Sequence, residues 1–199
     1  MDMKKILNST LHLLYKFYCR FRLRNKDFSI ISSNCIGGVM YHDLGLKFAS
    51  PTVNLFFYPE DFLKYVQNLK YYNTLELEDA TEESAYPIGK LEDIKIHFLH
   101  YNSFEEAKIM WDRRKQRINY NKLFIIMTDQ NGCELEHIKL FEQLPYQKVF
   151  FANKKLDFSS CFYIRGFEKE SCLGNIIEYQ KVGKRYYEQL DYVECLNRL

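Results

Sequence analysis

The run Phe28-Ser-Ile-Ile-Ser-Ser-Asn-Cys-Ile-Gly-Gly38 decides the fold, because it joins a short apolar strand directly to a turn and a helix start. Such a run is typical of a strand that is buried on both faces of a sheet. Further strands are predicted at 53–57, 94–100, 123–127 and 148–152, with an edge strand at 74–77. Helices are predicted between them, and strands that alternate with helices imply crossover connections. We therefore predict an α/β protein with three layers, α/β/α, around a largely parallel or mixed sheet.

Beyond 152 the pattern is weaker and predicts a strand at 162–164 and a helix from about 184 to the end. The chain has 199 residues, of which 47% are hydrophobic, so it can bury one core. We predict two parts, an N-terminal helix over 1–26 and a single α/β domain over 27–199. The six cysteines are far apart, without the spacing of a zinc module or a disulfide miniprotein. Reduced cytoplasmic thiols are expected.

Residues 1–26 hold seven basic side chains and one acid, whereas the rest of the chain is acidic overall. The charge is thus confined to one segment, which does not indicate a nucleic-acid-binding domain. A helix is predicted over 3–24, with Ile6, Leu13, Phe17 and Phe21 on one face. Its uncharged run is too short and too polar to cross a bilayer. The helix is predicted either to lie on the anionic inner face of the cell membrane, or to pack with its apolar face on this domain or on a second copy of the chain.

In parallel sheets the functional crevice lies beyond the carboxyl ends of the strands. Cys35 follows the first strand, and Asn34, Gly37 and Gly38 are predicted to bind ligand there, because amides at a helix start hold anions. His100 is the predicted base for a Cys35 nucleophile, with His42 as the alternative. Asp129 would orient the histidine, bind a sugar hydroxyl or hold a metal through water. Each of these residues also has a structural interpretation. Cys35 could be a buried apolar thiol, Gly37 and Gly38 could permit a tight turn, His100 could cap a loop, and Asp129 could belong to an ordinary turn.

Arginines 113, 114 and 117 follow one another on a predicted helix and are candidates for binding phosphate. The alternative is a solvated helix face neutralised by nearby acids. Phosphate-loop, dinucleotide-binding, serine-hydrolase and zinc-protease motifs are absent from the sequence. The sequence therefore identifies no cofactor and predicts no metal site.

An ordered set of short motifs carries a family resemblance: Ile30-Ile-Ser-Ser-Asn-Cys-Ile-Gly-Gly38, Asp43-Leu-Gly45, Tyr86-Pro-Ile-Gly89, Ile96-His-Phe-Leu-His-Tyr101 and Trp111-Asp-Arg-Arg-Lys115. Over about 27–153 the chain resembles a bacterial family of unknown function found among exopolysaccharide and capsule biosynthesis proteins. The resemblance implies a cytoplasmic α/β domain that serves surface polysaccharide assembly. The segment around Asn34-Cys35 is also similar to the Gly-Asn-Cys start of capsule enzymes proposed to be acetyltransferases, with Ser33 in place of the glycine.

Three functions follow from these observations. The first is an acyl-type group transferase acting on a sugar-nucleotide or lipid-linked glycan, with Cys35 as nucleophile or oxyanion-site residue, His100 as base and Asp129 as its orienter. The second is a non-catalytic sugar-binding or assembly protein of a polysaccharide complex. The third is a glycosyltransferase, for which no Asp-x-Asp motif is present.

Overall fold

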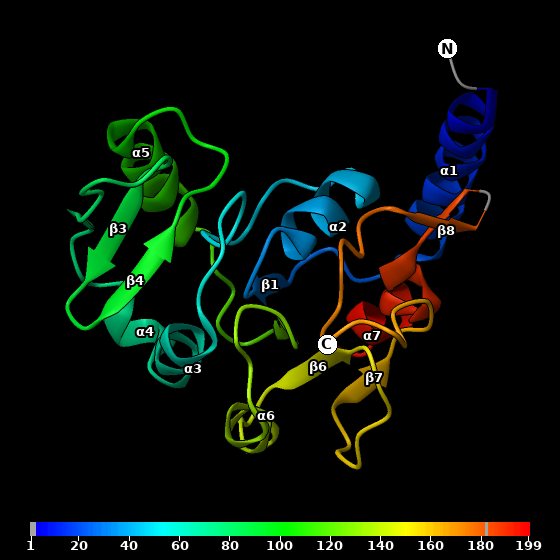
Figure 1. Ribbon diagram of the computed structural model, residues 1–199. Helices are drawn as coiled ribbons and strands as arrows, with labels where there is room; N and C mark the ends of the chain where they lie inside the picture. The colour runs from blue at the N-terminus through cyan, green and yellow to red at the C-terminus, as the bar shows by residue number, and fades with distance from the viewer. Residues whose placement is uncertain (1–2, 182) are drawn as a thin grey trace.

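A parallel sheet of four strands forms the centre of the computed structural model, which describes residues 3–181 and 183–199 (Figure 1). Its spatial order is β1-β5-β6-β7, and every neighbouring pair is parallel. The strands are β1 (Ser29–Ser32), β5 (Leu123–Thr128), β6 (Gln147–Ala152) and β7 (Cys161–Tyr163). The first three overlap the segments that the sequence predicts as strands, and β1 and β5 are buried along their whole length, as expected for strands covered on both faces.

Helices cover both faces of this sheet, which confirms the predicted three layers. One core contains Ile30 and Phe124 and is covered by α1 (Met3–Arg22), α2 (Ile36–Leu44), the short 3-10 helix η1 (Tyr186–Gln189) and α7 (Tyr192–Asn197). The other core contains Ile31 and Ile125 and is covered by α3 (Pro59–Gln67), α4 (Leu69–Tyr72), α5 (Phe104–Lys115) and α6 (Leu135–Glu142). Adjacent strand residues enter opposite cores because side chains alternate across a strand.

A second, antiparallel sheet corrects one part of the prediction. The segment 94–100 was expected to join the main sheet, but β4 (Ile94–His97) pairs with β3 (Ile88–Leu91) instead, and β3 pairs with β2 (Glu78–Asp79). In Figure 1 this small sheet and α5 lie on the opposite side of the molecule from α1. Hydrophobic periodicity identifies a strand but not its partner, so the pattern could not assign β4 to a sheet.

The predicted strand at 53–57 is wrong. Asn54 has a positive φ of 63°, which interrupts an extended ladder, and the segment forms only an isolated bridge between Phe56 and His97. The edge strand expected at 74–77 is also absent, and the edge of the second sheet is β2. The segment 53–57 is nevertheless packed against the core, since Val53, Leu55 and Phe57 are buried.

The outer edge of β1 is satisfied by side chains. Ile30 N–H donates to the Tyr41 hydroxyl at 2.9 Å, and Ser32 N–H donates to Thr52 Oγ1 at 3.0 Å. The alternate amides of Ser29 and Ser33 bond toward β5. Both edges of the strand therefore have acceptors for their backbone donors.

The C-terminal helix predicted from 184 is also corrected. The segment forms β8 (Tyr179–Lys181) and β9 (Lys184–Arg185), followed by η1 and the short α7. Gly183 turns between the strands with a φ of 78°, and a Cβ atom at this position would lie 2.6 Å from that of Leu11 on α1. The glycine is therefore required both by the turn and by its closeness to α1.

The N-terminal helix is confirmed as α1, two residues shorter than the predicted 3–24. Among the described residues, no helix is long and apolar enough to span a bilayer. All six cysteines are free thiols in the structure.

Candidate functional site

A cleft of about 540 Å³ lies beyond the carboxyl ends of β1 and β5, where the sequence placed the crevice. Cys35 and His100 both line it, although they follow strands of different sheets. The walls are largely apolar and come from Ile36, Phe56, Leu99, Ile176 and Ile177. Among the described residues that line the cleft, none is an acid, a lysine or an arginine.

Asn34 organises the entry from β1 into α2. Its Oδ1 accepts from the Ile36 N–H at 3.1 Å, and its Nδ2 donates to Gln130 Oε1 at 3.1 Å. Gln130 Nε2 in turn donates to the carbonyls of Leu173 and Gly174, both at 2.9 Å. These two amides therefore join β1, β5 and the C-terminal segment into one wall. Asn34 was predicted to bind ligand, and in this structure its side chain bonds to the protein.

Cys35 lies at the start of α2 as a half-buried thiol. Its Sγ donates to the Leu55 carbonyl at 3.7 Å. Burial raises the pKa of this thiol above its ordinary value, and the hydrogen bond to Leu55 offsets only part of that effect. The sequence analysis expected the helix start to favour a thiolate. Desolvation outweighs that effect here, so the group is a neutral thiol at neutral pH.

His100 is exposed at the rim of the cleft, three residues beyond β4. Its ring has no hydrogen bond to another side chain or to the backbone within the described part of the chain. Asn131, at the same rim, is also exposed, with a positive φ of 58°. These are the polar groups that the cleft leaves available to a ligand.

Asp129 does not join Cys35 and His100. Its Oδ2 accepts from the Asn153 N–H and its Oδ1 from the Leu173 N–H, both at 2.8 Å. It lines a separate, smaller cavity with Cys133. The carboxylate thus holds two loops together, and its placement does not support the predicted role as orienter of His100. Burial raises its pKa, and the two amide hydrogen bonds act in the opposite direction.

Gly37 and Gly38 are buried and serve close packing. A Cβ atom on Gly37 would lie 3.0 Å from Ser32 Cβ, and one on Gly38 would lie 3.1 Å from Val53 Cγ1. The first glycine lets α2 approach β1, and the second admits the 53–57 segment. Neither glycine lines the cleft. Their predicted part in ligand binding is therefore not supported by this placement.

The arginine cluster at the end of α5 and just beyond it also lies outside the cleft. Arg114 is buried, with Nη1 donating to the Tyr101 hydroxyl at 2.5 Å. Arg117 Nη1 donates to the Phe48 carbonyl at 3.2 Å, and Arg113 is exposed. Burial of Arg114 removes it from contact with a phosphate ligand. The three side chains thus do not form one anion site.

The sequence analysis missed the wall formed by 174–177. Gly174, Asn175, Ile176 and Ile177 line the cleft from a segment without regular structure. No periodicity marks such a segment, and the hydrogen bonds from Gln130 that hold it in place connect positions far apart in the sequence. The run Asp129-Gln-Asn-Gly132 is typical of a turn, but it does not indicate what Gln130 contacts.

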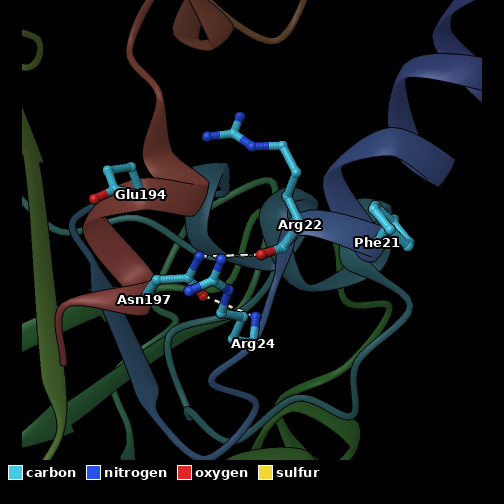
Figure 2. A pocket seen from close by; sticks show the side chains of 5 residues that line it. All are labelled: Phe21, Arg22, Arg24, Glu194 and Asn197. Atoms are coloured by element: carbon cyan, nitrogen blue, oxygen red, sulfur yellow. Dashed lines mark hydrogen bonds between the residues drawn. The ribbon is translucent and has the colours of Figure 1, made fainter.

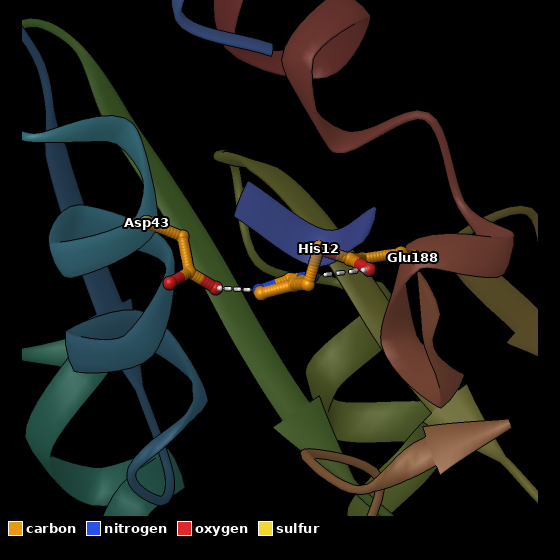
Figure 3. A group of neighbouring side chains, drawn as sticks. All are labelled: His12, Asp43 and Glu188. Atoms are coloured by element: carbon orange, nitrogen blue, oxygen red, sulfur yellow. Dashed lines mark hydrogen bonds and ion pairs between the residues drawn. The ribbon is translucent and has the colours of Figure 1, made fainter. Parts of the chain in front are cut away.

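A buried cluster outside the cleft holds three side chains of metal-ligating type: His12, Asp43 and Glu188 (Figure 3). His12 Nε2 lies 3.2 Å from Asp43 Oδ2, and Nδ1 lies 3.8 Å from Glu188 Oε2. Arg185 Nε is within 3.4 Å of both Asp43 Oδ2 and His12 Nε2. Because this cation lies beside two of the three ligand atoms, the group is better described as a buried ion cluster than as a metal centre.

The two carboxylates of this cluster differ in their electrostatics. Burial alone would raise the pKa of Asp43, but the hydrogen bond from His12 and the charge of Arg185 lower it to about 2. For Glu188, burial dominates and raises the pKa, although the Arg185 N–H donates to its Oε2 at 2.7 Å. Glu188 Oε1 is buried without a hydrogen-bond partner. The cluster therefore fastens α1 mainly through Asp43.

The parallel sheet of four strands, with helices on both faces and a cleft at its carboxyl edge, defines an α/β protein. Residues 6–197 match the family described as "Domain of unknown function (DUF1919)", and the chain belongs to this family. An "Uncharacterized protein" of Haemophilus influenzae (strain ATCC 51907 / DSM 11121 / KW20 / Rd) is 45% identical over 179 residues, which cover 88% of this chain and 87% of that protein. The family match includes α1 and the C-terminal segment, well beyond the predicted resemblance over 27–153. Neither description names a reaction or a polysaccharide.

Proposed function

We propose that the protein is a cytoplasmic group transferase of surface polysaccharide biosynthesis, exopolysaccharide or capsule, and that it transfers an acyl-type group to a glycan hydroxyl. The observation that carries the proposal is the pairing, in one cleft, of apolar walls with the exposed imidazole of His100. Histidine is the side chain that most readily takes up a proton near neutral pH. Apolar walls suit the acyl group of an activated donor.

The donor side of the cleft is formed by Ile36, Phe56 and Leu99, together with the isoleucines of the 174–177 segment. Their surfaces are already held in place, because the Gln130 hydrogen bonds fix that segment to β5. The acceptor side is the rim that carries His100 and Asn131. Their free hydrogen-bonding groups match the hydroxyls of a sugar-nucleotide or lipid-linked glycan.

The transfer needs one proton carrier. A ring nitrogen of His100 takes the proton of the acceptor hydroxyl as its oxygen attacks the acyl carbon, and a new ester bond forms. The bond between the acyl carbon and the donor's leaving group then breaks, and His100 returns the proton to that leaving group. The step is balanced without a covalent intermediate on the protein.

Cys35 takes the oxyanion-site role of the two that the sequence allowed. A neutral thiol whose pKa is raised is a poor nucleophile, but it can donate a weak hydrogen bond. In the structure the thiol donates to the Leu55 carbonyl and the Ile36 N–H donates to Asn34, so for this role the thiol must turn from Leu55 toward the acyl oxygen on which negative charge develops. We therefore expect Cys35 to assist the transfer and His100 to be required for it.

A non-catalytic sugar-binding or assembly protein is the second candidate. It is favoured by the engagement of Asp129 with two backbone amides, which leaves His100 without an orienting carboxylate. No specific observation favours the glycosyltransferase alternative, because the cleft has no acidic side chain among its described lining residues.

The test is complementation of a strain that lacks the gene, with the acyl content of its surface polysaccharide measured by NMR. The transferase predicts loss of acylation with His100→Ala, a smaller decrease with Cys35→Ser, and normal acylation with His42→Ala. His42 is a matched control because its side chain is 72% exposed and belongs to the far end of α2. Normal acylation with His100→Ala would contradict the transferase. Polysaccharide lost altogether without the gene, but restored by His100→Ala, would support the assembly protein.

A further inference from the structure

The N-terminal helix has one face that packs against the protein and one that does not. Asn8, His12, Cys19 and Leu23 are buried against the domain. The opposite face carries large apolar side chains that are 44% to 89% exposed: Ile6, Leu7, Leu13, Leu14, Phe17, Tyr18 and Phe21. We call this set the outer stripe. Thr10 is the polar residue that falls within it.

The outer stripe excludes docking of this helix face on the domain itself, and it leaves the membrane and a second copy as the predicted partners. Docking on the domain would have buried Leu13, Phe17 and Phe21, yet the domain packs against the other face of α1. A continuous exposed apolar face of this length on a surface helix indicates a site that binds a membrane or another protein. What covers it must be outside this chain.

Basic side chains border the outer stripe on both sides. Because Lys16 lies 3.8 Å from the Asp43 carboxylate and Arg22 pairs with Asp191, the charge left for an anion is that of Arg20, Arg24 and Lys26. Lys16 and Arg20 border one side and Arg22 the other, and the guanidinium groups of Arg20 and Arg22 lie over the rings of Phe17 and Tyr18, at 5.7 and 5.3 Å. The exposed Arg24 and Lys26 continue the charge beyond the helix. No acidic residue occurs anywhere from 3 to 26.

A polar hollow of about 520 Å³ lies where the outer stripe ends, lined by Phe21, Arg22, Arg24, Glu194 and Asn197 (Figure 2). Arg22 is held by Asp191, through contacts of 2.6 and 3.2 Å. The Arg24 backbone N–H donates to Asn197 Oδ1 at 2.8 Å, whereas its guanidinium has no hydrogen bond within the described part of the chain. An apolar stripe therefore leads directly to a basic group that is free to bind an anion.

We propose that α1 docks the protein on an anionic lipid bilayer, with the outer stripe in the interface and the basic border against the phosphate headgroups. An amphipathic helix with these two properties lies in the plane of the membrane. A span is excluded by the finding that α1 is not apolar enough. A second copy is disfavoured, because two such helices would bring two basic borders together. The proposal is independent of the reaction in the cleft.

The test is co-sedimentation of the full chain with vesicles of phosphatidylcholine, with and without phosphatidylglycerol. Binding is expected only to the vesicles that contain phosphatidylglycerol, and it should fall several-fold when salt is raised to about 0.5 M. The double variant Leu14→Glu/Phe17→Glu should bind at least about tenfold more weakly, because two apolar anchors are lost. Both side chains are more than half exposed, so the fold should tolerate the change, which circular dichroism checks.

The matched control is the double variant Ile109→Glu/Leu135→Glu, which places the same two charges at exposed apolar positions on α5 and α6, 64% and 52% exposed. It should bind like the unchanged protein. A Phe21→Trp variant provides a second measurement: its fluorescence should shift to shorter wavelength on the anionic vesicles, against a constant background from the buried Trp111. Equal binding of the double variant and the unchanged protein would overturn the proposal. So would a dimer, detected by light scattering, that the double variant abolishes without any vesicle binding.

Discussion

Phe56 and His97 exchange two backbone hydrogen bonds, of 2.8 and 2.9 Å, and their rings stack with centroids 4.6 Å apart. This bridge connects the segment between α2 and α3 to β4, the last strand of the second sheet. Phe56 lines the cleft, and His100 follows His97 by three residues. The bridge is therefore what brings His100 to the cleft that contains Cys35.

The first prediction concerns His97. Burial lowers its pKa and the charge of Lys95 adds to this effect, so the folded protein keeps the ring neutral where the unfolded chain binds a proton. Stability that depends on His97 is therefore lost as pH falls below about 6.5. His97→Phe keeps the aromatic stack and gives up no hydrogen bond, because Nδ1 is buried without a partner. Urea denaturation should show a smaller loss on acidification for the variant. Equal losses would contradict the interpretation.

A second prediction concerns Asp43. Its carboxyl is buried and its pKa is lowered from 3.8 to about 2, which corresponds to about 2 kcal/mol of stability. Because the folded pKa is the lower one, this stability is present above pH 4 and lost as pH falls toward 2, by about the same amount. Asp43→Asn should therefore lower the free energy of unfolding by about 2 kcal/mol at neutral pH. The difference from the unchanged protein should shrink in acid.

The opposite behaviour is expected of Glu188 in the same cluster. Its pKa is raised chiefly by burial, so acidification through the folded pKa stabilises the protein. Glu188→Gln removes a buried charge but keeps an oxygen that can accept from the Arg185 N–H. Its stability at neutral pH should equal or exceed that of the unchanged protein. A loss comparable to that of Asp43→Asn would show that both carboxylates hold α1 equally.

The fourth prediction separates a structural from a catalytic Asp129. Asp129→Ala leaves two backbone donors unsatisfied and should cost about 1–3 kcal/mol. The control Asp157→Ala replaces an exposed acid in the loop between β6 and β7, and it should lower the free energy of unfolding by less than about 0.5 kcal/mol. Both values come from denaturant unfolding. Unchanged stability of Asp129→Ala together with lost acylation would restore the role of orienter.

The fifth prediction is the reactivity of Cys35. Its raised pKa means little thiolate near neutral pH, so labelling by iodoacetamide should be slow and should still accelerate above pH 9. Cys133 and Cys161, whose pKa burial raises to about 12 and about 11, are internal references for slow thiols. Mass spectrometry of the labelled peptides gives the three rates. A fast Cys35 with a plateau below pH 8 would reinstate it as a nucleophile.

The sequence predicted the strands that are covered on both faces and the helix that begins with a clear start signal. The strands β1, β5 and β6 and the helix after Pro59 follow directly from apolar patterning and a proline at a helix start. It misplaced β4 and the 53–57 segment, because apolar patterning marks a segment as a strand without giving its partner. In the structure β4 pairs with β3, and the 53–57 segment forms only the Phe56–His97 bridge. The continuous helix expected from 184 to the end is absent for a similar reason. The hairpin of β8 and β9 turns at Gly183, which lies against Leu11 of α1, and local patterning does not reveal a contact between positions so far apart.

The candidate site was predictable only in part. Cys35 and His100 both line the cleft, as predicted, but the rule of carboxyl ends accounts only for Cys35. His100 follows a strand of the second sheet and reaches the cleft through the Phe56–His97 bridge. Asp129 obeys the same rule, but its carboxylate is taken by the amides of Asn153 and Leu173, which no local pattern encodes. The cluster of His12, Asp43 and Glu188 spans almost the whole chain, so spacing could not reveal it.

The hydroxyl groups of Tyr41 and Thr52 on the outer edge of β1 have a consequence for self-association. An exposed strand edge is a template on which another molecule can add a strand and begin to aggregate. Here the donors that such a strand would use are already bonded within the chain. Natural sheets commonly guard an edge with charges or proline, whereas this one is closed by two side-chain oxygens. Because Ser32 and Thr52 are buried, Thr52→Val would leave the Ser32 N–H without an acceptor inside the protein, which costs stability and does not open the edge to another strand.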